Sequence, residues 1–96
     1  MLKNFVAKST ANTDVTVCTA AEGKELSIMS VMINGGANGG DITLKYPNGF
    51  TAGFTIAAED TIFIDTKVNL PPDTSLAINA TAAGISVMAS AAELDA

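Results

Sequence analysis

Apolar and polar residues alternate with a period of two over several short segments of the chain. In residues 41–46 the apolar side chains of Ile42 and Leu44 fall on one face, and the threonine and lysine that follow them fall on the other. The same alternation recurs in residues 50–57 and 84–90. Successive side chains of a β-strand point to opposite faces, so each segment predicts a strand with one buried face.

Turn-forming residues separate these segments at regular intervals. Residues 46–50, with the sequence Tyr-Pro-Asn-Gly-Phe, predict a tight hairpin, because proline presets φ and Asn-Gly tolerates positive φ. Residues 90–96 are expected to form a helical turn or a frayed tail. The pattern predicts about eight strands, at residues 3–8, 13–19, 25–34, 41–46, 50–57, 61–65, 74–80 and 84–90.

Short strands at this spacing, without helical periodicity, predict an all-β fold. The two architectures that fit are an antiparallel β-sandwich and a jelly roll. The chain has 96 residues, which is enough for one hydrophobic core, so we expect a single domain over residues 1–96. Apolar residues make up 48% of the chain but aromatic residues only 5%, so aliphatic side chains must supply most of that core.

The charged residues exclude several classes of function. Ten carboxylates against five lysines give a net charge of -5, and there is no histidine, arginine or tryptophan. Without histidine the chain lacks a Ser-His-Asp or Cys-His nucleophile and an imidazole metal ligand. An acidic chain also repels nucleic acid and anionic lipid, and no apolar run is long enough to span a membrane. We therefore expect no enzyme, no cofactor, and neither a nucleic-acid nor a membrane partner.

The remaining candidates for chemistry are weak. Cys18 is the only cysteine, and a small apolar role within a strand fits it better than a reactive thiol. The acidic residues near the strand at 61–65 could form a weak cation site, but solvated charges at strand edges are more typical. These residues are Glu59, Asp60, Asp65 and Asp73. We expect no metal site and no catalytic residue.

A glycine-rich segment over residues 34–40 contains Gly35, Gly36, Gly39 and Gly40. A phosphate-binding loop would lead into a helix and carry a basic residue, whereas this segment leads into a predicted strand. We interpret it as a flexible loop that could adapt to a neighbouring subunit.

Alternation fails in the predicted strand at residues 25–34. Simple alternation places Leu26, Ile28 and Met32 on one face, yet the opposite face is apolar as well. A half-exposed antiparallel strand has one polar face, so a second surface must cover this strand. The outward-facing apolar positions of this and two other strands predict a subunit interface of Met29, Val31, Ile33, Phe63 and Met88. The alternative is that the N-terminal segment around Leu2, Phe5 and Val6 covers the second face within the monomer.

The order of these segments resembles the small β-sandwich accessory proteins of tailed-bacteriophage virions. The resemblance covers residues 13–93 and is one of pattern, carried by residues 16–20, 26–34, 41–44, 62–65, 68–78 and 85–90 and by the Pro-Asn-Gly hairpin. The turn at residues 72–73 is Pro-Asp where many of those proteins have Gly-Asp. The resemblance implies a virion component without catalytic residues.

The expected function is therefore that of a non-enzymatic structural protein of the virion, above all a capsid decoration or cement protein that stabilises the head. The alternatives are a tail or fibre accessory protein and a carbohydrate-binding or adhesive module, although a single tyrosine and no tryptophan disfavour sugar stacking. The expected partners are further copies of the chain, as a trimer or dimer, and the major capsid protein or another virion protein. The first eight residues predict no secretory leader, so we expect synthesis in the host cytoplasm and assembly into the virion.

Overall fold

The computed structural model describes the backbone of residues 1–96 and every side chain except that of Thr66. The predicted all-β fold is confirmed, and the described chain contains no α-helix, only a 3-10 turn at Pro47–Gly49. The eight strands are β1 (Leu2–Lys8), β2 (Val15–Thr19), β3 (Lys24–Asn34), β4 (Gly40–Lys45), β5 (Thr51–Ile56), β6 (Thr61–Leu70), β7 (Ser75–Ala80) and β8 (Ser86–Asp95).

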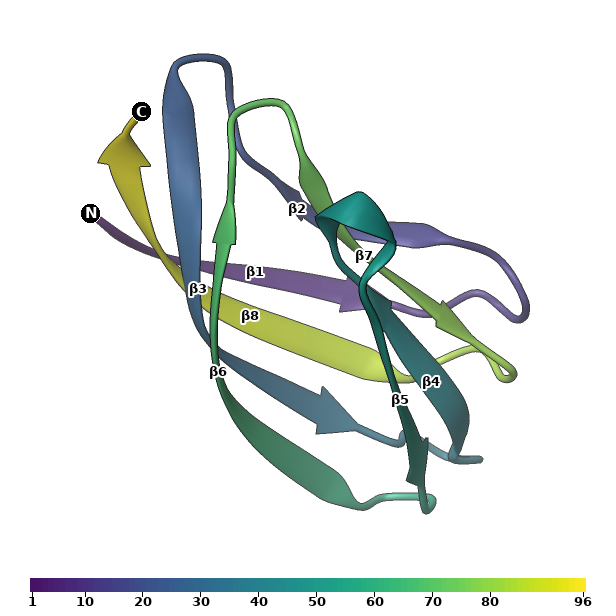
Figure 1. Ribbon diagram of the computed structural model, residues 1–96. Helices are drawn as coiled ribbons and strands as arrows, with labels where there is room; N and C mark the ends of the chain where they lie inside the picture. Colours follow the sequence, from purple (N-terminus) through teal and green to yellow (C-terminus); the bar gives the residue numbers. More distant parts are fainter.

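The strands form two antiparallel sheets that pack face to face, in the orders β1-β8-β3-β6 and β2-β7-β4-β5 (Figure 1). Strand β4 pairs with β5, β3 with β6, β2 with β7, and β1 with β8. The chain therefore behaves as one long hairpin, closed at the β4–β5 turn, whose successive strand pairs lie alternately in the two sheets. This topology is that of a jelly roll, one of the two architectures that the sequence predicts.

The tip of this long hairpin is the predicted Pro-Asn-Gly turn. Asn48 and Gly49 have positive φ values of 66° and 77°, which asparagine and glycine tolerate better than other residues. The backbone N–H of Tyr46 donates to the carbonyl of Phe50 at 2.8 Å and closes the turn. The turn residues thus fix the point at which the chain reverses.

Aliphatic side chains from both sheets fill the core. Each of the largest buried side chains is less than 2% exposed, and burying one of them contributes about 1.5–3 kcal/mol. They are Leu26, Ile28, Val31, Ile33, Leu70, Ile85 and Val87 near or in the first sheet, and Ile42, Leu44, Leu76 and Ile78 in the second.

The C-terminal residues belong to the sheet, so the expectation of a helical turn or a frayed tail over residues 90–96 is wrong. Strand β8 continues to Asp95 between β1 and β3. Its last residues pair with residues 24–28 of β3, and ion pairs join Lys24 to Asp95 and Lys3 to Glu93. The alanines in this segment give no local strand signal. They form a strand because residues 24–28 of β3 supply backbone hydrogen-bond partners. Strand β6 likewise extends beyond its predicted end at residue 65 to Leu70.

The glycine-rich segment packs against two neighbouring turns, which corrects its interpretation as a flexible loop. Gly35 N–H donates to the carbonyl of Asp60 at 2.9 Å, and Glu59 N–H donates to the carbonyl of Gly36 at 2.7 Å. A Cβ atom on Gly35 would lie 2.1 Å from the carbonyl oxygen of Ala57. The glycines are therefore needed for close backbone approach between loops at one end of the sandwich.

Candidate interaction surface

A β-bulge in β3 explains why alternation fails there. The pairing with β8 passes from Ile28 directly to Ser30, which leaves Met29 as an extra residue. An extra residue reverses the faces of the residues beyond it. Val31 and Ile33 are consequently fully buried in the core, so their assignment to an outward-facing interface is wrong.

The other predicted interface residues lie on the outside of the first sheet. Phe63 is 64% exposed and Met29 is 45% exposed, while Met88 is half-buried. The structure does not bring Met29 together with the other two, because Met29 occupies the bulge and Met88 pairs with a different residue of β3.

Strand register aligns four apolar side chains in one row across the outer face of the first sheet. Met88 of β8 pairs with Val6 of β1 on one side and with Met32 of β3 on the other, and Met32 pairs with Phe63 of β6. We call Val6, Met88, Met32 and Phe63 the apolar row. A shallow depression of about 150 Å³ lies over its Val6 end. Sequence reasoning missed Val6 and Met32, because neither the bulge nor the pairing of β1 with β8 is visible in a local pattern.

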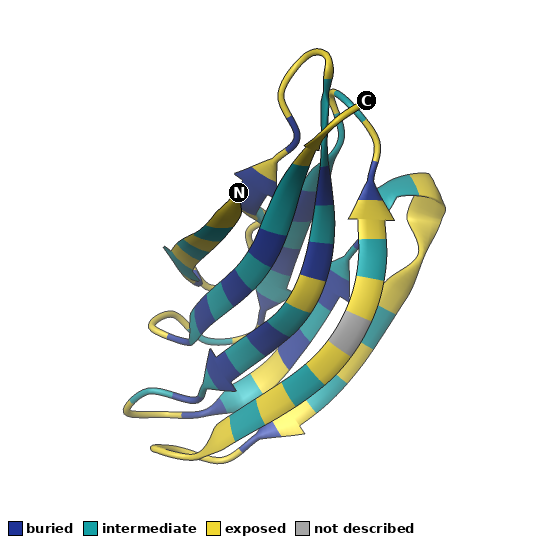
Figure 2. Ribbon diagram, turned by 90° about the vertical axis from the view of Figure 1, so that its left-hand side faces the viewer, coloured by how far each residue is buried: buried dark blue, intermediate teal, exposed yellow. Residues whose placement is uncertain are grey.

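The N-terminal segment does not cover this row. Strand β1 lies in the same sheet as an edge strand beside β8, and no other segment crosses the outer face in Figure 2. Phe5 packs against the core, whereas Leu2 and Val6 point outward and are 75% and 68% exposed. The alternative of cover within the monomer is therefore wrong, and the N-terminal strand enlarges the apolar surface.

Polar residues form a row on each side of the apolar row. One contains Lys8, Ser86, Asn34 and Thr61, and the other contains Asn4, Ser90, Ser30 and Asp65. Asn34 Nδ2 donates to Thr61 Oγ1 at 3.0 Å, and Ser90 Oγ donates to Asn4 Oδ1 at 2.8 Å. These two bonds mean that Asn34, Thr61, Ser90 and Asn4 keep a hydrogen-bond partner if the face is covered.

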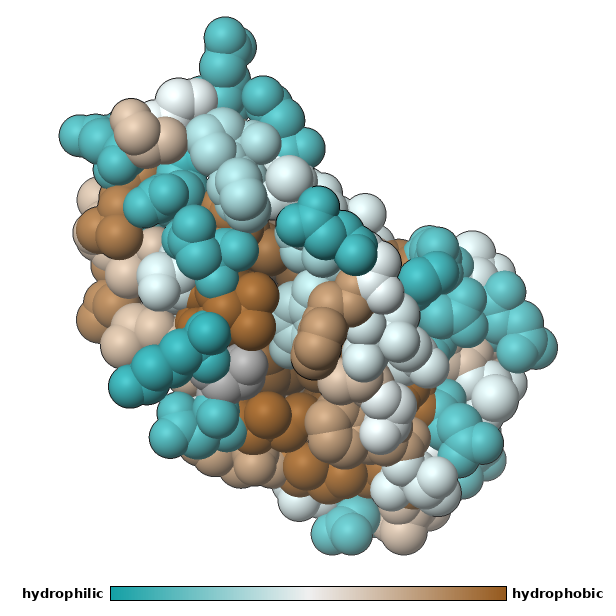
Figure 3. Space-filling view, viewed as in Figure 1, coloured by the Kyte–Doolittle hydropathy of each residue, from teal (hydrophilic) through white to brown (hydrophobic). Residues whose placement is uncertain are grey.

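A second exposed apolar surface lies along the open side of the sandwich, between β5 and β6 (Figure 3). The partly buried side chains there include Phe54, Ile62, Ile64 and Val68. A depression of about 290 Å³ lies at one end, lined by Tyr46, Pro47, Asn48, Phe50, Val68, Asn69 and Pro71. The rings of Tyr46 and Phe50 meet edge to face with their centres 5.8 Å apart. We call this depression the aromatic notch.

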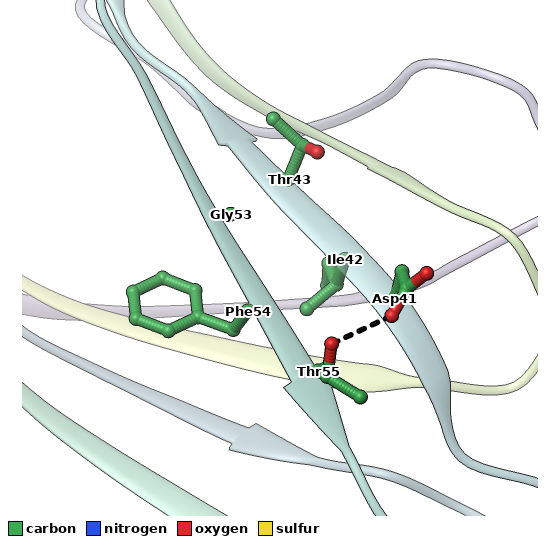
Figure 4. A pocket seen from close by; sticks show the side chains of 6 residues that line it. All are labelled: Asp41, Ile42, Thr43, Gly53, Phe54 and Thr55. Carbon is green, nitrogen blue, oxygen red and sulfur yellow. Dashed lines mark hydrogen bonds between the residues drawn. The ribbon is translucent and has the colours of Figure 1, made fainter.

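The outer face of the second sheet is polar instead. A depression of about 270 Å³ lies over Gly53, and the hydroxyl of Thr55 donates to Asp41 Oδ1 at 2.7 Å on its rim (Figure 4). Asp14 accepts from Asn79 Nδ2 at 2.8 Å and forms an ion pair with Lys45 at 3.1 Å. The hydrogen bond from Asn79 and the one from Lys45 lower the pKa of Asp14 below its usual value. The two outer faces of the molecule therefore differ sharply in polarity.

The candidate chemical groups do not assemble into a site. Glu59 and Asp60 precede β6, Asp65 lies within it, and Asp73 follows it, so the four carboxylates are spread along a whole strand. Among the described residues no three His, Cys, Asp or Glu side chains lie close enough to hold a metal ion. Cys18 is buried, and desolvation raises the pKa of its thiol.

The described chain contains no helix with the length and apolar character needed to span a bilayer. In the comparisons with known proteins, no family model matches the chain and no curated protein sequence is significantly similar to it.

Proposed function

We propose that this chain is a non-enzymatic structural protein of a tailed-bacteriophage virion, and specifically a decoration protein of the capsid. The observation that carries the proposal is the apolar row on an uncovered sheet. Exposed apolar side chains that adjoin one another in a small domain are typical of an assembly surface. In this role the protein needs a stable fold and a contact face, and no reacting groups.

Three further features support the proposal. The jelly roll is an architecture that viral capsid proteins use, and the segment pattern resembles virion accessory proteins. The contrast between the two outer faces gives the domain one side suited to contacts and one suited to solvent.

The test is the composition of virions. The gene for this chain should lie beside genes for a major capsid protein, portal or tail, and purified particles should contain the chain in a copy number close to that of the major capsid protein. Electron cryomicroscopy should place it on the head. Its absence from particles, or a gene within a metabolic operon, would overturn the proposal, and a low copy number at the tail would replace the head assignment with a tail one.

The aromatic notch favours carbohydrate binding as a second candidate function. Although aromatic residues are scarce in the sequence, Tyr46 and Phe50 lie together there, and Phe50 is 64% exposed. The amides of Asn48 and Asn69 also line the notch, and an aromatic platform with amide groups suits the C–H face and hydroxyls of a neutral sugar. Chemical-shift changes at these residues on titration with glucose, galactose and N-acetylglucosamine, lost in Phe50→Ala, would support this function. No change at millimolar sugar would exclude it.

A further inference from the structure

We propose that the apolar row is the contact through which two copies of this chain pack sheet against sheet. The inference rests on the proposed function, because it names the partner of the same assembly surface. Single exposed apolar side chains are common on monomers. Here two exposed side chains, Val6 and Phe63, and the two half-buried methionines between them adjoin one another across all four strands of a sheet. Their burial requires a partner that reaches across the whole face.

The face is large enough for a stable contact. Strands β1, β8, β3 and β6 contain 7, 10, 11 and 10 residues, so a strand spacing of ~4.8 Å and a rise of ~3.3 Å per residue make the whole face roughly 600 Å² in projection. Because side chains project from the sheet, the accessible area of the face is larger than its projected area. It therefore approaches the ~800 Å² per partner of a standard protein interface. One sheet against one sheet therefore suffices.

Charge favours a second copy of this chain as the partner. The whole chain carries a net charge of -5, but the apolar row and its two flanking polar rows contain one lysine and one aspartate, Lys8 and Asp65. These two residues lie on opposite edge strands and in opposite polar rows. This central part of the face therefore has no net charge, so two copies can bring it together with less repulsion than a surface with the average charge of the chain would cause.

The row is also complementary to itself under two-fold symmetry. With the symmetry axis parallel to the strands, Val6 faces Phe63 of the partner subunit and Met88 faces Met32 of the partner subunit. Lys8 then faces Thr61 of the partner subunit, so no like charges meet. The two central methionines have flexible, unbranched side chains that can fill the remaining gaps.

The first experiment measures mass in solution by sedimentation equilibrium. The wild type should form dimers or a higher assembly, and Phe63→Lys should weaken this association at least about tenfold. The matched control is Thr51→Lys, which places the same charge on β5, an edge strand of the second sheet, and should leave the association unchanged. Circular dichroism checks that both variants are folded.

The second experiment uses cross-linking, so it does not require a charged residue to be introduced into the row. In a Cys18→Ala background, Met32→Cys places a thiol at the centre of the row, and a short bismaleimide should link two copies. Thr43→Cys, on a central strand of the polar face, is the control and should give no dimer.

A wild type that is monomeric at about 100 μM would overturn the inference. An assembly that Phe63→Lys does not weaken and that Met32→Cys does not cross-link would overturn it as well. These outcomes are separate from those for the proposed function. A chain that is abundant in virions but monomeric in solution overturns only the self-association, whereas a dimer that is absent from virions overturns only the virion role.

Discussion

Gly35 shows how close backbone packing can restrict one position of a loop to glycine. Its φ is not in the left-handed region, but a Cβ atom there would lie 2.1 Å from the carbonyl oxygen of Ala57. We predict that Gly35→Ala lowers the free energy of unfolding by about 2 kcal/mol or more, because the two backbone segments must separate. Urea denaturation of purified protein measures this.

Gly53 provides the matched control for that substitution. It lies in strand β5, and a Cβ atom there would meet nothing within 4 Å. Gly53→Ala should leave the free energy of unfolding unchanged or raise it by about 0.5 kcal/mol, since alanine loses less backbone entropy on folding. Equal effects of the two alanine substitutions would show that the close approach at Gly35 does not constrain the loop.

Cys18 illustrates how burial sets reactivity. Its side chain is 4% exposed, and desolvation raises the pKa of the thiol. We predict that Ellman's reagent at pH 8 labels Cys18 in the folded protein at least about 100-fold more slowly than in urea. Thr16→Cys in a Cys18→Ala background, an exposed position on the same strand, should react rapidly without denaturant. Fast labelling of native Cys18 would contradict its placement in the core.

At the scale of elements, the bulge at Met29 determines which residues of β3 enter the core. Deleting Met29 would shift residues 24–28 by one position along the chain, so that their side chains exchange faces. Leu26 and Ile28 would then leave the core. At about 1.5–3 kcal/mol for each side chain, we predict a loss of roughly 3–6 kcal/mol from the free energy of unfolding. Met29→Ser keeps the bulge and should cost less than about 1 kcal/mol. Similar denaturation midpoints for the two variants would count against this role of the bulge.

The C-terminal half of β8 is the second element whose role can be tested. Deleting residues 91–96 removes the buried Ala91 and the partner of residues 24–28 in β3. We predict that thermal unfolding shifts downward by about 10 °C or more. Deletion of Ala96 alone should have little effect, because that residue follows the strand. A frayed tail would give the same midpoint for both deletions.

At the scale of the whole molecule, pH should act through exposed ion pairs on both sheets. The bond from Asn79 to Asp14 and the pair between Lys24 and Asp95 lower the pKa of both aspartates below the usual 3.8. A depressed pKa in the folded state contributes stability above the unfolded pKa, and this contribution is lost as pH falls through the folded value.

We therefore predict that the melting temperature falls as pH is lowered from about 4 to 2, and only slightly, because water screens both exposed carboxylates. The double variant Asp14→Asn, Asp95→Asn should show a smaller fall. Calorimetry across this pH range measures both, and parallel curves for the two proteins would refute the assignment.

Local sequence patterns were enough to predict the parts of the fold that depend on neighbours along the chain. Alternation located β4 and β5, and the Pro-Asn-Gly segment located the turn between them, because side-chain direction and positive φ are local properties. The count of eight strands, the all-β class and the burial of Cys18 within a strand followed in the same way.

Which face of the sheet each apolar residue occupies depends on pairing between distant strands. Val31 and Ile33 entered the core, and Met32 reached the outer face, because the bulge at Met29 follows from pairing with β8, more than fifty residues away in the sequence. The same pairing made residues 90–95 a strand and aligned Val6 with Phe63 across four strands. Register and bulges depend on hydrogen bonds between distant segments, so a local period cannot reveal the apolar row that those bonds assemble.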